Sequence, residues 1–90
     1  MKILSTPRFD RTIKKILKSE KIALDAAITT LLKQPEIGQL KKGDLAGVRV
    51  HKYKWQNQQK LLAYTLDAEV DAMILLGYGT HENFYRDLKN

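Results

Sequence analysis

The chain has 90 residues, of which 16 are basic and 10 acidic, so its formal net charge is +6. This length predicts one domain over residues 1–90 with a modest core, and the absence of cysteine excludes a disulfide framework, a thiolate zinc site and a cysteine nucleophile. The longest apolar run, residues 72–76, is too short to span a bilayer, and the N-terminus lacks the apolar stretch of a signal peptide. We therefore expect a cytoplasmic protein, not bound to a membrane, whose partner is a polyanion or an acidic protein.

The first third of the chain predicts a short strand followed by two helices. Residues 2–4 suit a strand, and Thr6 followed by Pro7 is typical of the N-cap and first position of a helix. Apolar residues then recur at helical spacing as far as Leu17, and a second apolar stripe predicts a helix over residues 21–33. Two helices with so short a join predict an antiparallel helical hairpin.

The middle of the chain predicts strands. Residues 48–55 alternate in polarity and are rich in β-branched and aromatic side chains, which favours a strand. The polar residues 56–59 indicate a turn, and residues 60–66 a second strand. Residues 72–76 form a continuous apolar run, typical of a strand buried on both faces. These segments predict a three-stranded meander.

The end of the chain completes the predicted fold. The Gly-Tyr-Gly segment at residues 77–79 is expected to end the last strand, and Thr80 to cap a short helix over residues 82–89. The predicted order is β-α-α-β-β-β-α. The fold class that we predict is α+β, with the helical hairpin packed on one face of a small antiparallel sheet.

Two lysines in the predicted strand 48–55 are candidates for phosphate chemistry. A period of two places Lys52 and Lys54 on one face, roughly 6.5–7 Å apart along the strand, while Arg49 and His51 fall on the other. Compact ammonium charges stabilise the charge that develops on a transferring phosphoryl group. The alternative is that these lysines only keep one face of the sheet soluble.

His81 and Tyr85 are candidates for proton transfer and base stacking. Histidine has an ordinary pKa near 6.5, which suits proton transfer near neutral pH. Tyr85 lies four residues after His81 and shares its face of the predicted helix, where its ring is able to stack on a base. The alternatives are a surface histidine beside the helix cap and an aromatic residue that anchors the helix to the sheet.

The positive charge is concentrated in the first two thirds of the chain. The net charge is +6 over residues 1–42, +3 over residues 43–66 and −3 over residues 67–90. Basic side chains on the helical hairpin are either simply solvated or a contact surface for phosphates. With two histidines and no cysteine, the sequence predicts no metal site and no cofactor. The candidate RNA-binding residues are Arg11, Lys14, Lys18, Arg49, Lys60 and Arg86.

Taken together, these segments resemble the RelE/ParE superfamily of bacterial toxin–antitoxin toxins over essentially the whole chain. The resemblance implies a RelE-like microbial RNase fold. Its most specific part is the last segment, residues 79–89. The matching segments are Leu-Lys-Lys-Gly-Asp-Leu-Ala-Gly at residues 40–47, Val-His-Lys-Tyr-Lys at 50–54, Leu-Leu-Ala-Tyr at 61–64 and Gly-Thr-His-Glu-Asn-Phe-Tyr-Arg-Asp-Leu-Lys at 79–89.

The resemblance implies a toxin of a type II module, most directly a ribosome-dependent mRNA interferase that cleaves mRNA by 2′-hydroxyl attack. Lys52 and Lys54 match a Lys-x-Lys that grips the substrate and stabilises the transition state in that branch. His81 matches a histidine in a Gly-x-His context that acts as acid or base. Tyr85 matches an aromatic residue that stacks on the mRNA base or aids proton transfer.

Two positions depart from this pattern and leave alternatives open. Other members of the RNase branch carry arginines at the places that correspond to Leu61 and Gly79. The alternatives are a toxin that poisons DNA gyrase and cleaves no nucleic acid, and an inert relative that only binds its antitoxin. The partners implied are an antitoxin with an acidic, amphipathic segment, and either the ribosome with its mRNA or gyrase.

Overall fold

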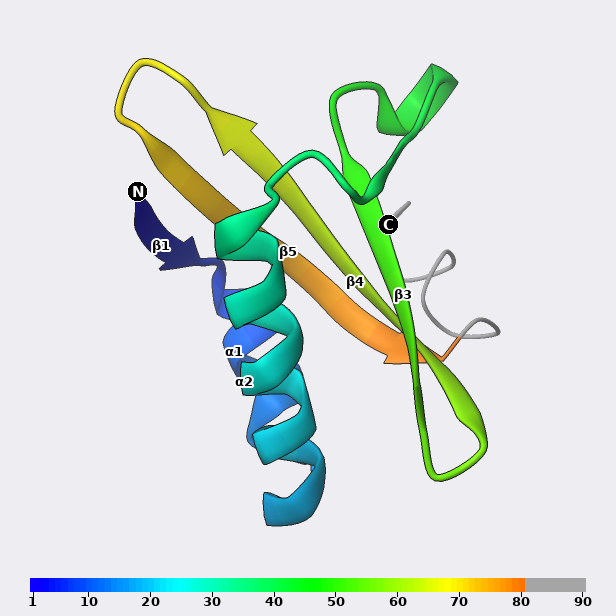
Figure 1. Cartoon of the computed structure of the whole chain (residues 1–90). Helices are drawn as coiled ribbons and strands as arrows, with labels where there is room; N and C mark the ends of the chain where they lie inside the picture. Colours follow the sequence, from blue (N-terminus) through cyan, green and yellow to red (C-terminus); the bar gives the residue numbers. More distant parts are fainter. Residues whose placement is uncertain (81–90) are drawn as a thin grey trace.

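The computed structural model describes residues 1–80, which form a five-stranded sheet with two helices packed against it (Figure 1). The predicted α+β class is thereby confirmed. No helix among residues 1–80 is long and apolar enough to cross a membrane. The elements in chain order are β1 (Lys2–Ser5), α1 (Pro7–Ile13), α2 (Lys18–Lys33), β2 (Gln39–Leu40), the 3₁₀ helix η1 (Gly43–Leu45), β3 (Arg49–Trp55), β4 (Gln58–Asp67) and β5 (Ala72–Thr80).

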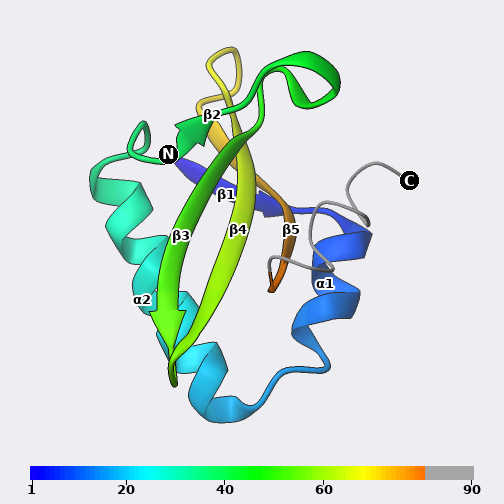
Figure 2. The same ribbon diagram turned by 90° about the vertical axis from the view of Figure 1, so that its right-hand side faces the viewer.

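The helical hairpin is present, with boundaries that differ from the prediction. Thr6 is the N-cap of α1, as predicted, and its hydroxyl accepts a hydrogen bond from the N–H of Phe9 at 3.2 Å. Helix α1 ends at Ile13, and α2 begins three residues earlier than predicted. The apolar spacing had continued into the turn because Ile16 packs against the same core as α1. The two helices run in opposite directions (Figure 2).

The sheet is mixed, which corrects the prediction of a purely antiparallel one. Its strand order is β1-β5-β4-β3-β2. Strand β1 pairs with β5 in parallel, with Lys2 opposite Ala72 and Ser5 opposite Leu75. The helical hairpin is the long crossover that such a parallel pair requires. Strand β2 lies between the predicted helix over residues 21–33 and the predicted strand over residues 48–55, where no strand was predicted, and adds an antiparallel neighbour to β3.

The predicted meander of β3, β4 and β5 is confirmed as antiparallel. Its first turn is shorter than predicted, because only Gln56 and Asn57 separate the two strands and both have positive φ angles, 50° and 63°. This is the backbone of a two-residue hairpin turn with a type I′ twist. The strands consequently begin and end closer to the turn, with Trp55 opposite Gln58.

Strand β5 runs to Thr80, so the prediction that the Gly-Tyr-Gly segment ends it is wrong. Gly77 lies opposite Ala63 and Gly79 opposite Leu61 in the ladder with β4. A register shift between Ala63 and Tyr64 absorbs the extra residue on β5. The glycines do not end the strand because β4 continues beside them and supplies their pairing partners.

The core occupies both faces of the sheet. The larger cluster lies between the helices and the sheet, and a smaller one covers the opposite face, which we call the far face. The predicted helix over residues 82–89 lies outside the described residues. The larger cluster contains Phe9, Leu24, Leu31, Leu62, Tyr64, Met73, Leu75 and Tyr78, and the smaller one Val50, Leu61 and Ala63, with Val48 and Leu76 packed against it.

Candidate functional site

Lys52 and Lys54 lie on the far face of the sheet, with both side chains exposed. Strand β3 pairs with β4 in unbroken register from Arg49 to Trp55, so no bulge separates the two lysines. Residues that face each other across a ladder share a face, and Lys52 lies opposite Leu61 of the far-face cluster. The prediction that the two lysines share one face is therefore confirmed.

The two positions next to Lys52 on the far face carry no charge. Leu61 is fully buried and lies opposite Lys52 on one side and Gly79 on the other. Among residues 1–80, no atom outside Gly79 and its chain neighbours lies within 4 Å of a Cβ atom added at Gly79. The two positions where the resemblance expects arginines are thus cross-strand neighbours beside Lys52. We call this place, made of Leu61 and Gly79, the apolar floor.

Lys60 faces the helices and not the far face. Its side chain is only 10% exposed, and its Nζ lies 3.1 Å from the Glu20 carboxylate of α2. It also lies 5.8 Å from the centre of the Trp55 ring, within the range of a cation–π contact. The structure therefore does not bring Lys60 together with Lys52 and Lys54.

Arg49 also has partners within the fold. Its guanidinium donates to the carbonyl oxygens of Glu36 at 3.0 Å and Gly38 at 3.1 Å. Tyr64 holds the same loop, because its hydroxyl donates to the carbonyl of Pro35 at 2.7 Å and accepts from the N–H of Gly38 at 2.9 Å. These bonds clamp the loop between α2 and β2, so they give Arg49 a structural role.

The remaining basic candidates that the structure describes lie on the helical hairpin. Arg11 is on α1, Lys14 is at its C-cap and Lys18 is the first residue of α2, and all three are exposed. The helices cover the face of the sheet opposite to Lys52 and Lys54, so these candidates form a second basic surface and not an extension of the lysine pair.

Three candidates, His81, Tyr85 and Arg86, lie outside the described residues 1–80. Their nearness to Lys52 and Lys54 stays a prediction. Among the predicted catalytic residues, the structure brings together Lys52 and Lys54.

A buried polar network behind the lysine strand was not predicted. Tyr78 donates a hydrogen bond to Glu20 at 2.7 Å, and the Tyr53 and Tyr78 hydroxyls are 2.6 Å apart. Because Tyr78 uses its one proton toward Glu20, Tyr53 is the donor in the second bond. Burial, followed by the hydrogen bond to Glu20, raises the pKa of Tyr78 far above its ordinary value. The network, which includes Lys60, thus joins α2 to β3, β4 and β5.

The sequence gives little signal for this network. Glu20 stands between Ser19 and Lys21 in a polar stretch of α2, where an exposed carboxylate is the ordinary expectation. Only its position four residues before Leu24, on the buried side of α2, could have suggested that it faces the core.

Comparison with known proteins identifies the family. The family model described as "ParE-like toxin of type II bacterial toxin-antitoxin system" matches residues 3–89. A search among curated proteins finds no match.

Solved structures agree in fold. The E. coli RelBE toxin–antitoxin complex contains a chain with a TM-score of 0.71 and 16% identity, covering 88% of this chain and 94% of that one. The isolated E. coli RelE toxin gives 0.70 and 16%, covering 88% and 82%. A conserved hypothetical protein of Helicobacter pylori gives 0.57 and 23%, covering 91% and 96%. With a family model that spans nearly the whole sequence, the chain belongs to the ParE-like toxins of type II bacterial toxin–antitoxin systems, within the RelE/ParE superfamily.

Proposed function

We propose that this toxin is a ribosome-dependent mRNA interferase. The observation that carries the proposal is the pair of exposed lysines, Lys52 and Lys54, on the far face of β3. Neither takes part in any ion pair found among residues 1–80. Two adjacent cations with no ion-pair partner in this part of the chain can bind a phosphate. The fold shared with RelE supports the same function.

The proposed reaction is an in-line transesterification. The ribose 2′-oxygen forms a bond to the adjacent phosphorus while the bond to the leaving 5′-oxygen breaks, giving a 2′,3′-cyclic phosphate and a 5′-hydroxyl. A base accepts the 2′-hydroxyl proton and an acid donates one to the 5′-oxygen. Lys52 and Lys54 stabilise the extra negative charge on the phosphorane. His81 is assigned to one proton transfer, and Tyr85 to stacking on the nucleotide or aiding proton transfer.

The decisive test measures cleavage of mRNA on programmed ribosomes. The variant Lys52→Ala/Lys54→Ala is expected to cleave at least about 100-fold more slowly, because it loses both groups that stabilise the transition state. The matched control is Lys33→Ala/Lys42→Ala, which removes the same charge from exposed positions outside β3, and it should cleave like the wild type. Equal rates for the two double variants would disprove the site. His81→Ala and Tyr85→Ala complete the series.

A second candidate function is inhibition of DNA gyrase, and the apolar floor favours it. A nuclease that works with protein cations gains from positive charge around the phosphate, yet Leu61 and Gly79 supply none beside Lys52. Gyrase supercoiling and mRNA cleavage are therefore measured side by side with the same preparation. Stalled gyrase with intact mRNA would contradict the interferase proposal. Normal supercoiling together with intact mRNA would indicate an inert relative.

The proposed partner that holds this toxin inactive is a cognate antitoxin. The E. coli RelE toxin is known in complex with its antitoxin RelB. The basic helical hairpin, and the +9 of net charge over residues 1–66, suit a partner with an acidic segment.

A further inference from the structure

The part of β3 that carries the lysine pair has strand support on one side. Strand β2 pairs with only the first two residues of β3, so from residue 51 onward β4 is its only strand neighbour within residues 1–80. The β4 partner of Lys54 lies one residue beyond the last described pair of β4 with β5, which joins Lys60 to Thr80. A strand end with few neighbours opens locally more easily than the centre of a sheet. A further contact that holds this stretch would therefore fix where Lys52 and Lys54 lie.

Tyr53, the residue between the two lysines, supplies such a contact on the helix face of the sheet. Its hydroxyl lies 2.6 Å from that of Tyr78 on β5, and the centres of the two rings are 6.3 Å apart. Strands β3 and β5 are not neighbours, because β4 runs between them (Figure 1). The hydrogen bond therefore crosses over β4 and ties the strand of the lysines directly to β5. We call the bond between Tyr53 and Tyr78 the tyrosine brace.

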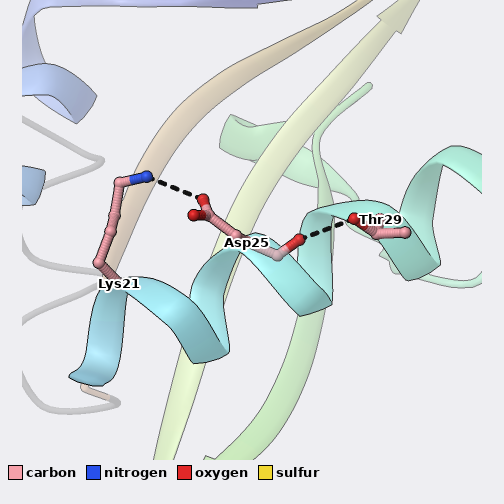
Figure 3. Close-up of polar contacts among 3 residues, drawn as sticks. All are labelled: Lys21, Asp25 and Thr29. Atoms are coloured by element: carbon pink, nitrogen blue, oxygen red, sulfur yellow. Dashed lines mark hydrogen bonds and ion pairs between the residues drawn. The ribbon is translucent and has the colours of Figure 1, made fainter. Parts of the chain in front are cut away.

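The tyrosine brace is anchored on α2. Tyr78 donates to Glu20 at 2.7 Å, and Lys60 of β4 lies 3.1 Å from the same carboxylate oxygen. Lys21, the next residue of α2, pairs instead with Asp25 in an exposed position (Figure 3). Among residues 1–80, no buried side-chain nitrogen or oxygen lacks a hydrogen-bond partner. A buried network that is fully satisfied is rigid, so the Glu20 carboxylate holds β3, β4 and β5 together against α2.

The tyrosine brace meets each strand next to residues of the proposed reaction. Tyr53 has a lysine of the proposed phosphate site on either side, and Tyr78 lies two residues before the end of β5 at Thr80. His81, which is assigned to proton transfer, follows directly in the sequence. Tyr53 and Tyr78 pack in the larger core cluster, on the face opposite to the lysines, so neither contacts a phosphate bound by the lysines. Misplacing a reacting group by about 1 Å can cost on the order of 100-fold in rate.

We infer that Tyr53 and Tyr78 are positioning residues for the proposed cleavage. Their bond, anchored on Glu20, holds Lys52 and Lys54 in a fixed place relative to the end of β5, and so presents both cations to one phosphate. The inference rests on the proposed function, because it assigns a role within that reaction. A purely structural role would instead make the two tyrosines matter for folding alone, whether or not the lysines are present.

The test is a double-mutant cycle on programmed ribosomes between Tyr53→Phe and Lys52→Ala/Lys54→Ala. Tyr53→Phe keeps the ring and removes the hydroxyl, and should lower kcat about tenfold with KM unchanged, since no contact with RNA is lost. In the background of Lys52→Ala/Lys54→Ala the same change should cost less than about twofold, because no lysines remain to be positioned. Equal losses in the two backgrounds would overturn the inference.

The matched control is Tyr64→Phe, which removes another tyrosine hydroxyl that is bonded inside the fold. That hydroxyl bonds to Pro35 and Gly38, in the loop between α2 and β2. Below its melting temperature Tyr64→Phe should cleave like the wild type, even where it loses as much stability as Tyr53→Phe. A loss of rate shared by both variants would attribute the effect to stability, and the positioning role would be wrong.

Amide hydrogen exchange separates this inference from the proposed function, because it needs no cleavage. Tyr53→Phe should speed exchange of the protected amides within residues 51–55 by about fivefold or more. The amides of Lys2 and Thr6, which are bonded on the β1 side of the sheet, should exchange as in the wild type. If the wild type cleaves no mRNA, the interferase proposal fails and the catalytic role of the tyrosine brace fails with it. If the wild type cleaves and Tyr53→Phe changes neither exchange nor rate, this inference fails and the interferase proposal stands.

Discussion

The Lys60 ammonium lies 3.1 Å from the Glu20 carboxylate, and both side chains are almost completely buried. The pair joins α2 to β4, and Tyr78 donates a further hydrogen bond to the same carboxylate oxygen. Lys60→Met would leave the Glu20 charge in the core without its cation. We expect this change to lower the free energy of unfolding by about 3–5 kcal/mol, measured by urea denaturation.

The control for this prediction is Lys21→Met, which removes the exposed pair with Asp25. Exposed pairs contribute about 0–1 kcal/mol, so this variant should unfold near the wild-type midpoint. The double variant Glu20→Gln/Lys60→Met should lose less stability than the two single losses added together, since it removes both charges. Strict additivity would show that the two side chains do not stabilise each other.

Gly38 leaves room for the Tyr64 ring to pack beneath the loop between α2 and β2. A Cβ atom at Gly38 would lie 2.5 Å from the Tyr64 hydroxyl and 2.7 Å from its ring. The tyrosine cannot yield freely, because its hydroxyl bonds to Pro35 and Gly38. Gly38→Ala should therefore destabilise the fold by about 1–3 kcal/mol. Gly79→Ala, where the added Cβ meets no described residue within 4 Å, is the control in the same thermal melts, and equal losses would contradict the steric argument.

Gly79→Arg adds a cation to the apolar floor beside Lys52. Within the described part of the chain nothing lies within 4 Å of a Cβ atom at Gly79, and the backbone there is not in the left-handed region that favours glycine. If the toxin is an mRNA interferase, a third cation near the phosphate should speed cleavage by up to about tenfold. Gly79→Ala separates charge from bulk in the ribosome assay. An arginine variant no faster than the alanine variant would place the reacting phosphate elsewhere.

His51 makes stability depend on pH. Its ring stacks on Tyr53 with 6.3 Å between centroids, and burial lowers the His51 pKa below its ordinary value of 6.5. The unfolded chain therefore takes up a proton at a higher pH than the folded one does, and stability falls as the pH drops from 6.5 through the lowered pKa. His51→Gln should flatten this part of the curve. The control His81→Gln removes the other histidine and should keep the fall in stability below pH 6.5 that His51 causes. If that fall disappeared only in the His81 variant, His51 would not be its source.

Much of the fold was predictable because capping residues and the spacing of apolar residues indicate helices and strands locally. The N-cap at Thr6 and the alternation that puts Lys52 and Lys54 on one face follow from neighbouring residues alone. Element ends were less predictable where packing decides them. Ile16 lies in a turn yet contacts the core, and Gly77 and Gly79 stay in a strand because β4 lies beside them.

The sequence by itself determined the α+β class, the family and the lysine pair, because periodicity and motif order are carried by residues close together in the chain. Only the tertiary structure decided the parallel pairing of β1 with β5, the burial of Lys60 on Glu20 and the apolar floor of Leu61 and Gly79. Each of these joins segments far apart in the sequence. A lysine in a strand has the same local pattern whether it meets solvent or a buried carboxylate, so its role depends on which segment the fold brings opposite to it.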